Sequence, residues 1–251
     1  MQASIKKRFA HGLSFDANYT WSKLLDEQDS SGWGRVAGAA IYQDAYNPKA
    51  NYGPSNFDIA QMFKGDLVYQ LPFGKGRSFL QNSGGFVDAL LGGWHISGIW
   101  TVLTGSPFTP TWGGTNLSGS ATTTLFLAGF SSAESWYPNV VGNWKVSKPG
   151  IGEWFNPAAF AQPAPYTFGD MGRNVLFGPD LRTLNFSMGK TFRIPILGEG
   201  GQIQFRFDAN NALNHPCFSN PNASIGTPGA GIITGTSVGG RVLQLGARLA
   251  F

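Results

Sequence analysis

The chain has few charged residues and no long apolar run. Charged residues make up only 13% of its 251 residues, about half of the ~25% that is typical of soluble domains. No apolar stretch approaches the ~18–20 residues that a membrane-spanning helix needs. The single cysteine, Cys217, excludes an internal disulfide framework and a multi-cysteine metal site. If the protein lies in a membrane, it must therefore cross it with strands.

Residues that carry chemistry are also scarce and scattered. The three histidines, His11, His95 and His215, fall in a turn, a strand and a loop of the predicted structure, which argues against a histidine metal site. Cys217 has no neighbour in the sequence that would activate it as a nucleophile. The net charge of +4 comes from dispersed basic residues, with one cluster at residues 6–8. We therefore expect no enzymatic activity, no cofactor, no metal and no nucleic-acid partner.

The chain is instead rich in aromatic residues and glycine, and its last strand is amphipathic. Aromatic residues make up 14% of the chain, which also contains 35 glycines. From residue 241 to Phe251 the side chains alternate with a period of two, as in a strand with one apolar face. The strand ends on an aromatic residue, which is typical of an outer-membrane β-barrel. The apolar side chains of this alternation, which we call its apolar parity, are those of Leu243, Leu245, Ala247, Leu249 and Phe251.

The same alternation predicts about seven strands in all. Short and long connections alternate between them, which is the pattern of a barrel with tight periplasmic turns and long outer loops. The connection of residues 72–93 is predicted to hold a short helix within residues 80–91, ended by two glycines. The fold class that we predict is all-β, a partial antiparallel transmembrane barrel with long extracellular loops. The segments are residues 3–9, 13–22, 59–71, 94–103, 183–194, 202–210 and 241–251.

The polar parity of these strands carries charged side chains that would face the inside of a barrel. There they would line a polar lumen or hold a plug domain, and opposite charges on neighbouring strands can pair. The alternative is the solvated face of a β-sandwich, which has the same alternation. The predicted lumen-facing residues are Lys64, Asp66, Arg193, Arg206, Asp208 and Arg248.

Aromatic residues of the two longest loops are the candidates for ligand binding. Exposed aromatic rings stack on sugars or apolar ligands. The alternative is that they pack the loops against one another, because folded loops of this length need a core of their own. The candidates are Trp33, Tyr42, Trp112, Trp136, Tyr137 and Trp154.

Several motifs in order along the chain resemble one family. Together they resemble the C-terminal barrel of TonB-dependent outer-membrane receptors, and most of all the Oar-like group with a carboxypeptidase-regulatory-like N-terminal domain. The motifs are NYGPSNFD (51–58), LVYQLPFGKGR (67–77), LGGWHISG (91–98), TGSPF (104–108), WFNPAAF (154–160), FGDMGRNVLFGP (168–179) and FRFDANNALNHP (205–216).

The resemblance implies a barrel of about 22 strands around a plug, and energised uptake of a scarce ligand across the bacterial outer membrane. Residues 1–251 lack a plug and a TonB-box segment, so we expect them to be the C-terminal part of such a barrel, as a truncated gene would encode. The expected partners are outer-membrane lipid, the rest of the barrel, the plug, the TonB system and an unknown small ligand or oligosaccharide. The alternatives are a secreted β-sandwich that binds carbohydrate, or a surface adhesin.

Overall fold

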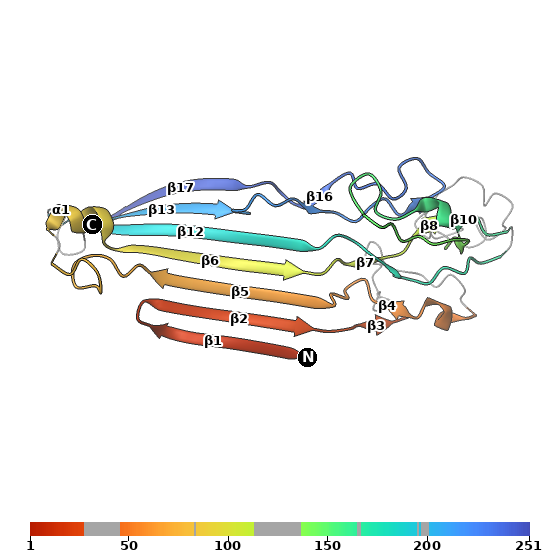
Figure 1. Cartoon of the computed structure of the whole chain (residues 1–251), viewed down its shortest axis with the longest axis horizontal. Coiled ribbons are helices and arrows are strands. Elements are labelled where there is room, and N and C mark those ends of the chain that lie inside the picture. Colours follow the sequence, from red (N-terminus) through yellow and green to blue (C-terminus); the bar gives the residue numbers. More distant parts are fainter. Residues whose placement is uncertain (28–45, 83, 113–136, 165–166, 195, 197–200) are drawn as a thin grey trace.

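The computed structural model contains one large antiparallel sheet of seven strands in the order β1-β2-β5-β6-β12-β13-β17 (Figure 1). It describes residues 1–27, 46–82, 84–112, 137–164, 167–194, 196 and 201–251. Each long strand pairs with the next one along the chain, so the predicted antiparallel arrangement of about seven strands is confirmed. The strands are β1 (Gln2–Ala10), β2 (Leu13–Trp21), β5 (Gln61–Gln70), β6 (Trp94–Leu103), β12 (Leu181–Arg193), β13 (Gln202–Asn210) and β17 (Val242–Ala250).

The connections segregate to the two ends of the sheet, as the sequence predicts. The tight turn between β1 and β2, with His11 at φ 52° and Gly12 at φ 80°, lies at the same end as helix α1 (Gly85–Leu91). We call this the short-turn end. The long connections gather at the opposite end (Figure 1), which we call the loop end.

The pairing register gives the sheet one apolar and one polar face. Residues directly opposite each other on paired strands lie on the same face. Across the sheet, Phe15 pairs with Leu67, Leu67 with Gly98, and Gly98 with Phe186. The same face continues through Ala209 to Leu243. The polar side chains that alternate with these residues lie on the opposite face. The single-strand alternations therefore combine into one continuous apolar surface.

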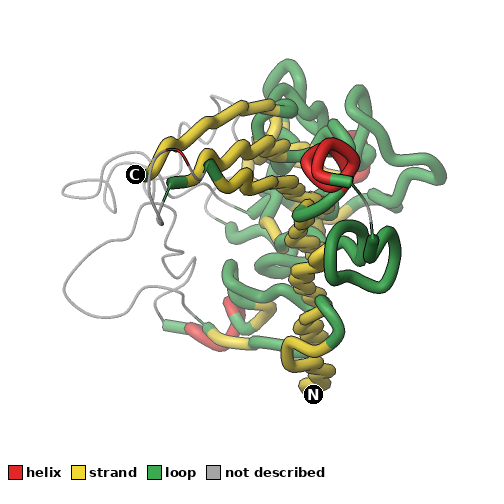
Figure 2. The backbone as a smooth tube through the Cα atoms, turned by 90° about the vertical axis from the view of Figure 1, so that its left-hand side faces the viewer, coloured by secondary structure: helices red, strands yellow, loops and turns green. Residues whose placement is uncertain are grey.

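This apolar face is the outer, convex side of a curved sheet. Figure 2 shows the strands end-on as an open arc, with α1 on its convex side. The Nε1 of Trp94 and the Nζ of Lys190, both on the apolar face, donate hydrogen bonds to the carbonyl oxygen of Leu90 in α1. The side chain of Leu245 on this face is 83% exposed. Among the described residues no second long-stranded sheet covers it, so the alternative of a two-layer sandwich is wrong.

The loop end contains short ladders that the sequence did not predict. They join segments far apart in the chain: β7 pairs with β11, and β8 pairs with β15 in parallel. The described parts of residues 22–60, 104–180 and 211–241 form what we call the loop cap. Its strands are β3 (Leu25–Asp26), β4 (Gly53–Pro54), β7 (Pro107–Phe108), β8 (Thr111–Trp112), β9 (Asn139–Val140), β10 (Phe160–Ala161), β11 (Leu176–Phe177), β14 (Cys217–Phe218), β15 (Ser224–Ile225) and β16 (Thr236–Val238), and its 3-10 helices are η1 (Pro48–Asn51) and η2 (Pro157–Ala159).

One local expectation needs correction, and β1 contains one irregularity that alternation does not predict. The register of β1 with β2 shifts between Lys7 and Ala10. Before this shift Lys7 pairs with Phe15 on the apolar face, the face that the alternation of Ala3 and Ile5 gives to this position. Helix α1 begins at Gly85, later than the predicted residue 80, since the preceding residues form a turn in which Leu80 has φ 64°.

Candidate functional site

The loop cap has a hydrophobic core of its own. Its fully buried residues come from the connections between β6 and β12 and between β13 and β17, and aromatic rings dominate it. Phe155 lies at its centre, with its ring centroid 6.0 Å from that of Phe108 and 5.9 Å from that of Phe160. Each buried aromatic side chain contributes about 1.5–3 kcal/mol of transfer free energy. The core is formed by Phe108, Tyr137, Phe155, Ala159, Phe160, Met171, Leu176 and Ile225.

Three of the predicted ligand-binding aromatics belong to this core or pack against it. Tyr137 is 7% exposed and buried in the core, and Trp112 and Trp154 pack against it. The indole N–H of Trp154 donates to the carbonyl oxygen of Phe177 at 2.8 Å. This packing is the alternative that the sequence left open for these rings. Three further candidates lie outside the described residues: Trp33, Tyr42 and Trp136.

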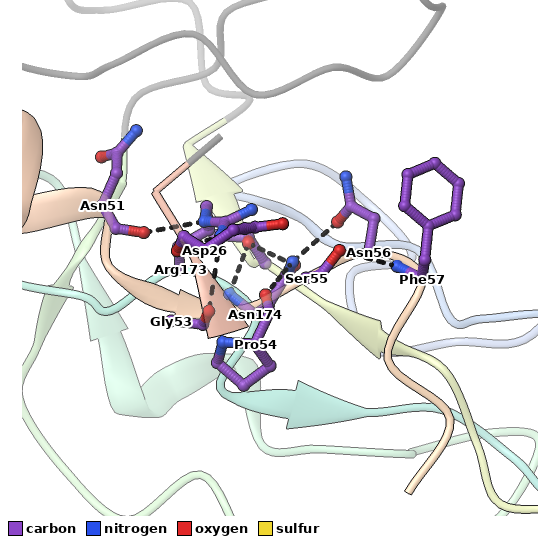
Figure 3. A network of polar contacts seen from close by, with 10 residues as sticks. Asp26, Asn51, Gly53, Pro54, Ser55, Asn56, Phe57, Arg173 and Asn174 are labelled. Atoms are coloured by element: carbon purple, nitrogen blue, oxygen red, sulfur yellow. Dashed lines mark hydrogen bonds and ion pairs between the residues drawn. The ribbon is translucent and has the colours of Figure 1, made fainter. Parts of the chain in front are cut away.

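A buried arginine links the loop after β2 to the loop before β12 (Figure 3). The side chain of Arg173 is 1% exposed. Its guanidinium forms an ion pair with Asp26 and donates to the carbonyl oxygens of Asn51 at 2.8 Å and Asp26 at 2.7 Å. Because the guanidinium has a fixed fork of donors, one side chain holds several backbone acceptors at once.

The next residue, Asn174, extends the same network to a third segment. It adopts φ 54°, a left-handed conformation that asparagine tolerates. Its Nδ2 donates to the carbonyl oxygen of Pro54 at 2.8 Å and to Oδ1 of Asn56 at 2.7 Å. The hydroxyl of Thr109, just after β7, donates to Oδ1 of Asn174 at 2.9 Å. Arg173 and Asn174 thus tie the β2–β5 connection and two parts of the β6–β12 connection into one unit at the loop end.

Two motifs far apart in the sequence meet in this network. Residues 51–58 supply acceptors beside those of Asp26, and residues 168–179 supply Arg173 and Asn174. Arg173 and Asn174 are not among the residues predicted for a site, because nothing in a single sequence shows that the two segments touch. The indication that the sequence does contain is the presence of polar residues, glycine and proline within motifs that resemble those of a known family.

Gly53 allows the two motifs to approach closely. A Cβ atom at this position would lie 2.6 Å from the carbonyl oxygen of Arg173. We expect Gly53→Ala to destabilise the loop cap by about 1–3 kcal/mol, because backbone must shift to relieve the overlap. Hydrogen exchange of the cap amides measures the effect.

The matched control for this substitution is Gly150→Ala. Gly150 is also in the loop cap, and a Cβ there would meet no atom within 4 Å. Exchange rates in the cap should remain at the unmodified level in Gly150→Ala. Equal exchange in the two variants would contradict the close-approach role of Gly53.

The predicted lumen-facing residues share the polar, concave face of the sheet. Lys64 and Asp66 pair in register with Asn18 and Asp16 of β2, and Arg248 pairs with Gln204. Arg193 pairs with Gln202 through its backbone, and its side chain lies outside the described residues. The positions of Arg206 and Asp208 follow from the same pairing.

Ion pairs on this face occur both across strands and along a strand. Lys6 and Asp16, on neighbouring strands, are 3.3 Å apart. Arg206 pairs instead with Asp208 on its own strand, at 2.8 Å, and Ser187 of β12 also donates to Asp208. The concave face thus offers charged and hydrogen-bonding groups, which suit water or a polar protein surface.

The described residues present surfaces and a folded cap rather than a cluster of metal-binding side chains. Within the described ranges there is no group of three or more histidine, cysteine, aspartate or glutamate side chains placed to hold a metal ion. No helix in the same ranges has the length and apolarity to cross a membrane. What the molecule offers is a large exposed apolar surface on one side, a polar surface on the other, and a folded loop cap at one end.

Comparison with known proteins identifies a family whose members have a lipid-facing and an interior face. A family model described as an outer membrane beta barrel domain matches residues 1–244. No curated protein and no solved structure matches the chain significantly.

Proposed function

The chain belongs to the outer membrane beta barrel domain family, and we propose that it is part of the barrel of a TonB-dependent receptor that imports a ligand. Family membership places it in the bacterial outer membrane. The apolar convex face then contacts lipid, and the polar concave face lines the interior. The proposal of a receptor is supported by the ordered motifs that resemble such receptors.

The observation that carries this proposal is the combination of a two-faced sheet with open edges. Strands β1 and β17 each have one neighbour in the described sheet. In hydrocarbon an unpaired strand edge is costly, since each unsatisfied backbone group costs several kcal/mol. We propose that further strands close the barrel and that a plug domain contacts Lys64, Asp66, Arg206, Asp208 and Arg248 on the concave face.

The loop cap is the proposed place of first contact with the ligand. Its network of Arg173 and Asn174 holds the loops as one body, so that aromatic side chains keep fixed positions. Tyr52 and Phe57, beside this network in the sequence, are 59% and 66% exposed. Rings exposed on a rigid support suit stacking on a small apolar ligand or an oligosaccharide.

A comparison of two bacterial strains tests the import function. One strain lacks the gene for this protein, and the other lacks a functional TonB protein. We expect both strains to leave the same compound in the growth medium, as measured by mass spectrometry of the spent medium. Complementation of the first strain should restore uptake. If no compound stays in the medium of both strains, the receptor proposal is wrong.

A further inference from the structure

We propose that the described part of the connection between β5 and β6, residues 71–82 and 84–93, forms a binding site for an anionic phospholipid on the outside of the barrel at the short-turn end. The site combines helix α1, an apolar hollow beside it and two cations of the preceding turn. It requires that the sheet lie in a membrane, and it is independent of import and of any transported ligand.

Helix α1 is fixed on the lipid-facing side of the sheet. The carbonyl oxygen of Leu90 accepts hydrogen bonds from Nζ of Lys190 at 2.9 Å and from Nε1 of Trp94 at 3.0 Å. Both donors belong to the apolar face, and the Lys190 Nζ also lies 5.0 Å from the ring centroid of Trp94. Figures 1 and 2 show α1 at the short-turn end, on the convex side. This end is where the hydrocarbon layer gives way to headgroups.

The outward side of α1 is apolar. Phe86 is 82% exposed, Leu90 60%, Leu91 45% and Val87 39%. Its one charged residue is Asp88. The Oδ1 of Asp88 accepts a hydrogen bond from the backbone N–H of Lys75, in the turn before the helix, at 2.5 Å. A helix that exposes this much apolar surface suits the boundary between headgroups and acyl chains.

An apolar hollow of about 590 Å³ lies beside α1. This volume falls in the range of small-molecule sites, about 300–1,000 Å³. It has no charged side chain in its lining, so its chemistry matches a hydrocarbon chain. The lining residues are Leu71, Phe73, Phe79, Leu80, Leu91 and Trp94.

The headgroup preference follows from charge. The turn that provides Phe73 and Phe79 also carries Lys75 and Arg77, both exposed. Asp88 is the only acidic residue in the sequence of residues 71–93, and it is engaged with the turn backbone. Cations at a membrane surface attract anionic lipid. The structure therefore assigns an acyl chain to the hollow and a headgroup of net negative charge to Lys75 and Arg77.

The test places an environment-sensitive NBD fluorophore on α1 in the full-length protein, reconstituted into phospholipid vesicles. Phe86→Cys supplies the attachment point, and the unmodified protein is the labelling blank because Cys217 is fully buried. Quenching by spin-labelled phosphatidylglycerol is compared with quenching by spin-labelled phosphatidylcholine. We expect phosphatidylglycerol to quench more strongly. The double variant Lys75→Gln/Arg77→Gln should lose this preference, since each cation contributes about fivefold to attraction of anionic lipid.

Two control positions separate failure of this site from failure of the membrane assignment. Leu245→Cys on the apolar face should be quenched by both lipids, and Phe57→Cys in the loop cap by neither. If position 245 is quenched and position 86 is not, the phospholipid site is refuted and the barrel stands. Equal quenching of position 86 by the two lipids also refutes it. If neither position is quenched, both assignments fail.

Discussion

Replacing Arg173 with methionine is expected to loosen the loop cap while the seven-stranded sheet remains in the membrane. The guanidinium is buried and serves an ion pair with Asp26 together with the backbone carbonyls of Asn51 and Gly53. Methionine fills much of the volume but offers no donor, so Asp26, Asn51 and Gly53 lose the hydrogen bonds that Arg173 donates. The side chain of Arg173 is buried, whereas that of Asp26 is 28% exposed. Loss of the hydrogen bond to a buried acceptor costs about 1–3 kcal/mol, and we expect a destabilisation of the cap of this order.

The measurement is proteinase K cleavage of the loop cap in intact outer membranes, with heat-modifiable electrophoretic mobility as the readout for the barrel. Cleavage should be much faster in Arg173→Met, with mobility unchanged. The control is Arg182→Met. Arg182 pairs with Asp180 on the surface, with a side chain 61% exposed, and such pairs contribute at most about 1 kcal/mol. Equal cleavage of both variants would show that the network does not hold the cap.

An arginine introduced at Leu245 is expected to prevent stable insertion of the barrel. Leu245 lies in β17 on the convex face and is 83% exposed. A lipid-facing arginine near the middle of the bilayer costs about 2–4 kcal/mol. We expect Leu245→Arg to reduce the amount of folded protein in the outer membrane, measured by heat-modifiable mobility after a urea wash.

The adjacent residue provides the control, because neighbours in a strand face opposite sides. Gln244 is in the same strand and pairs in register with Asp208 on the concave face. Gln244→Arg introduces the same charge at the same depth, beside a carboxylate, and should leave the folded amount unchanged. Should the two variants behave alike, the assignment of lipid-facing and interior faces would be wrong.

The seven strands could be predicted because their signal is local. Along β2, side chains alternate between apolar and polar with a period of two, and β2 pairs with β5 in the register that places Phe15 opposite Leu67. Each predicted segment corresponds to one long strand. The exceptions are also local: the register shift in β1 and the left-handed Leu80 before α1 depend on backbone conformations that alternation does not encode.

The loop cap could not be predicted in the same way, because its contacts join distant segments. The hydrogen bond from Arg173 to the carbonyl oxygen of Asn51 spans 122 residues of sequence. Neither segment shows a periodic pattern, and an isolated arginine in a loop gives no indication of burial. Lys190 is a similar case, since a lysine on the apolar parity acquires a partner only when α1 folds over the sheet.

By itself, the sequence determined that the chain forms an antiparallel sheet with one apolar side, since a strand's alternation is a property of consecutive residues. It also determined the placement of short turns and long loops at opposite ends. Only the tertiary structure decided that the apolar side is convex and exposed, that Arg173 and Asn174 hold two long loops together, and that α1 lies against Lys190. These features depend on curvature and on contacts between segments far apart in the chain, which local pattern cannot specify.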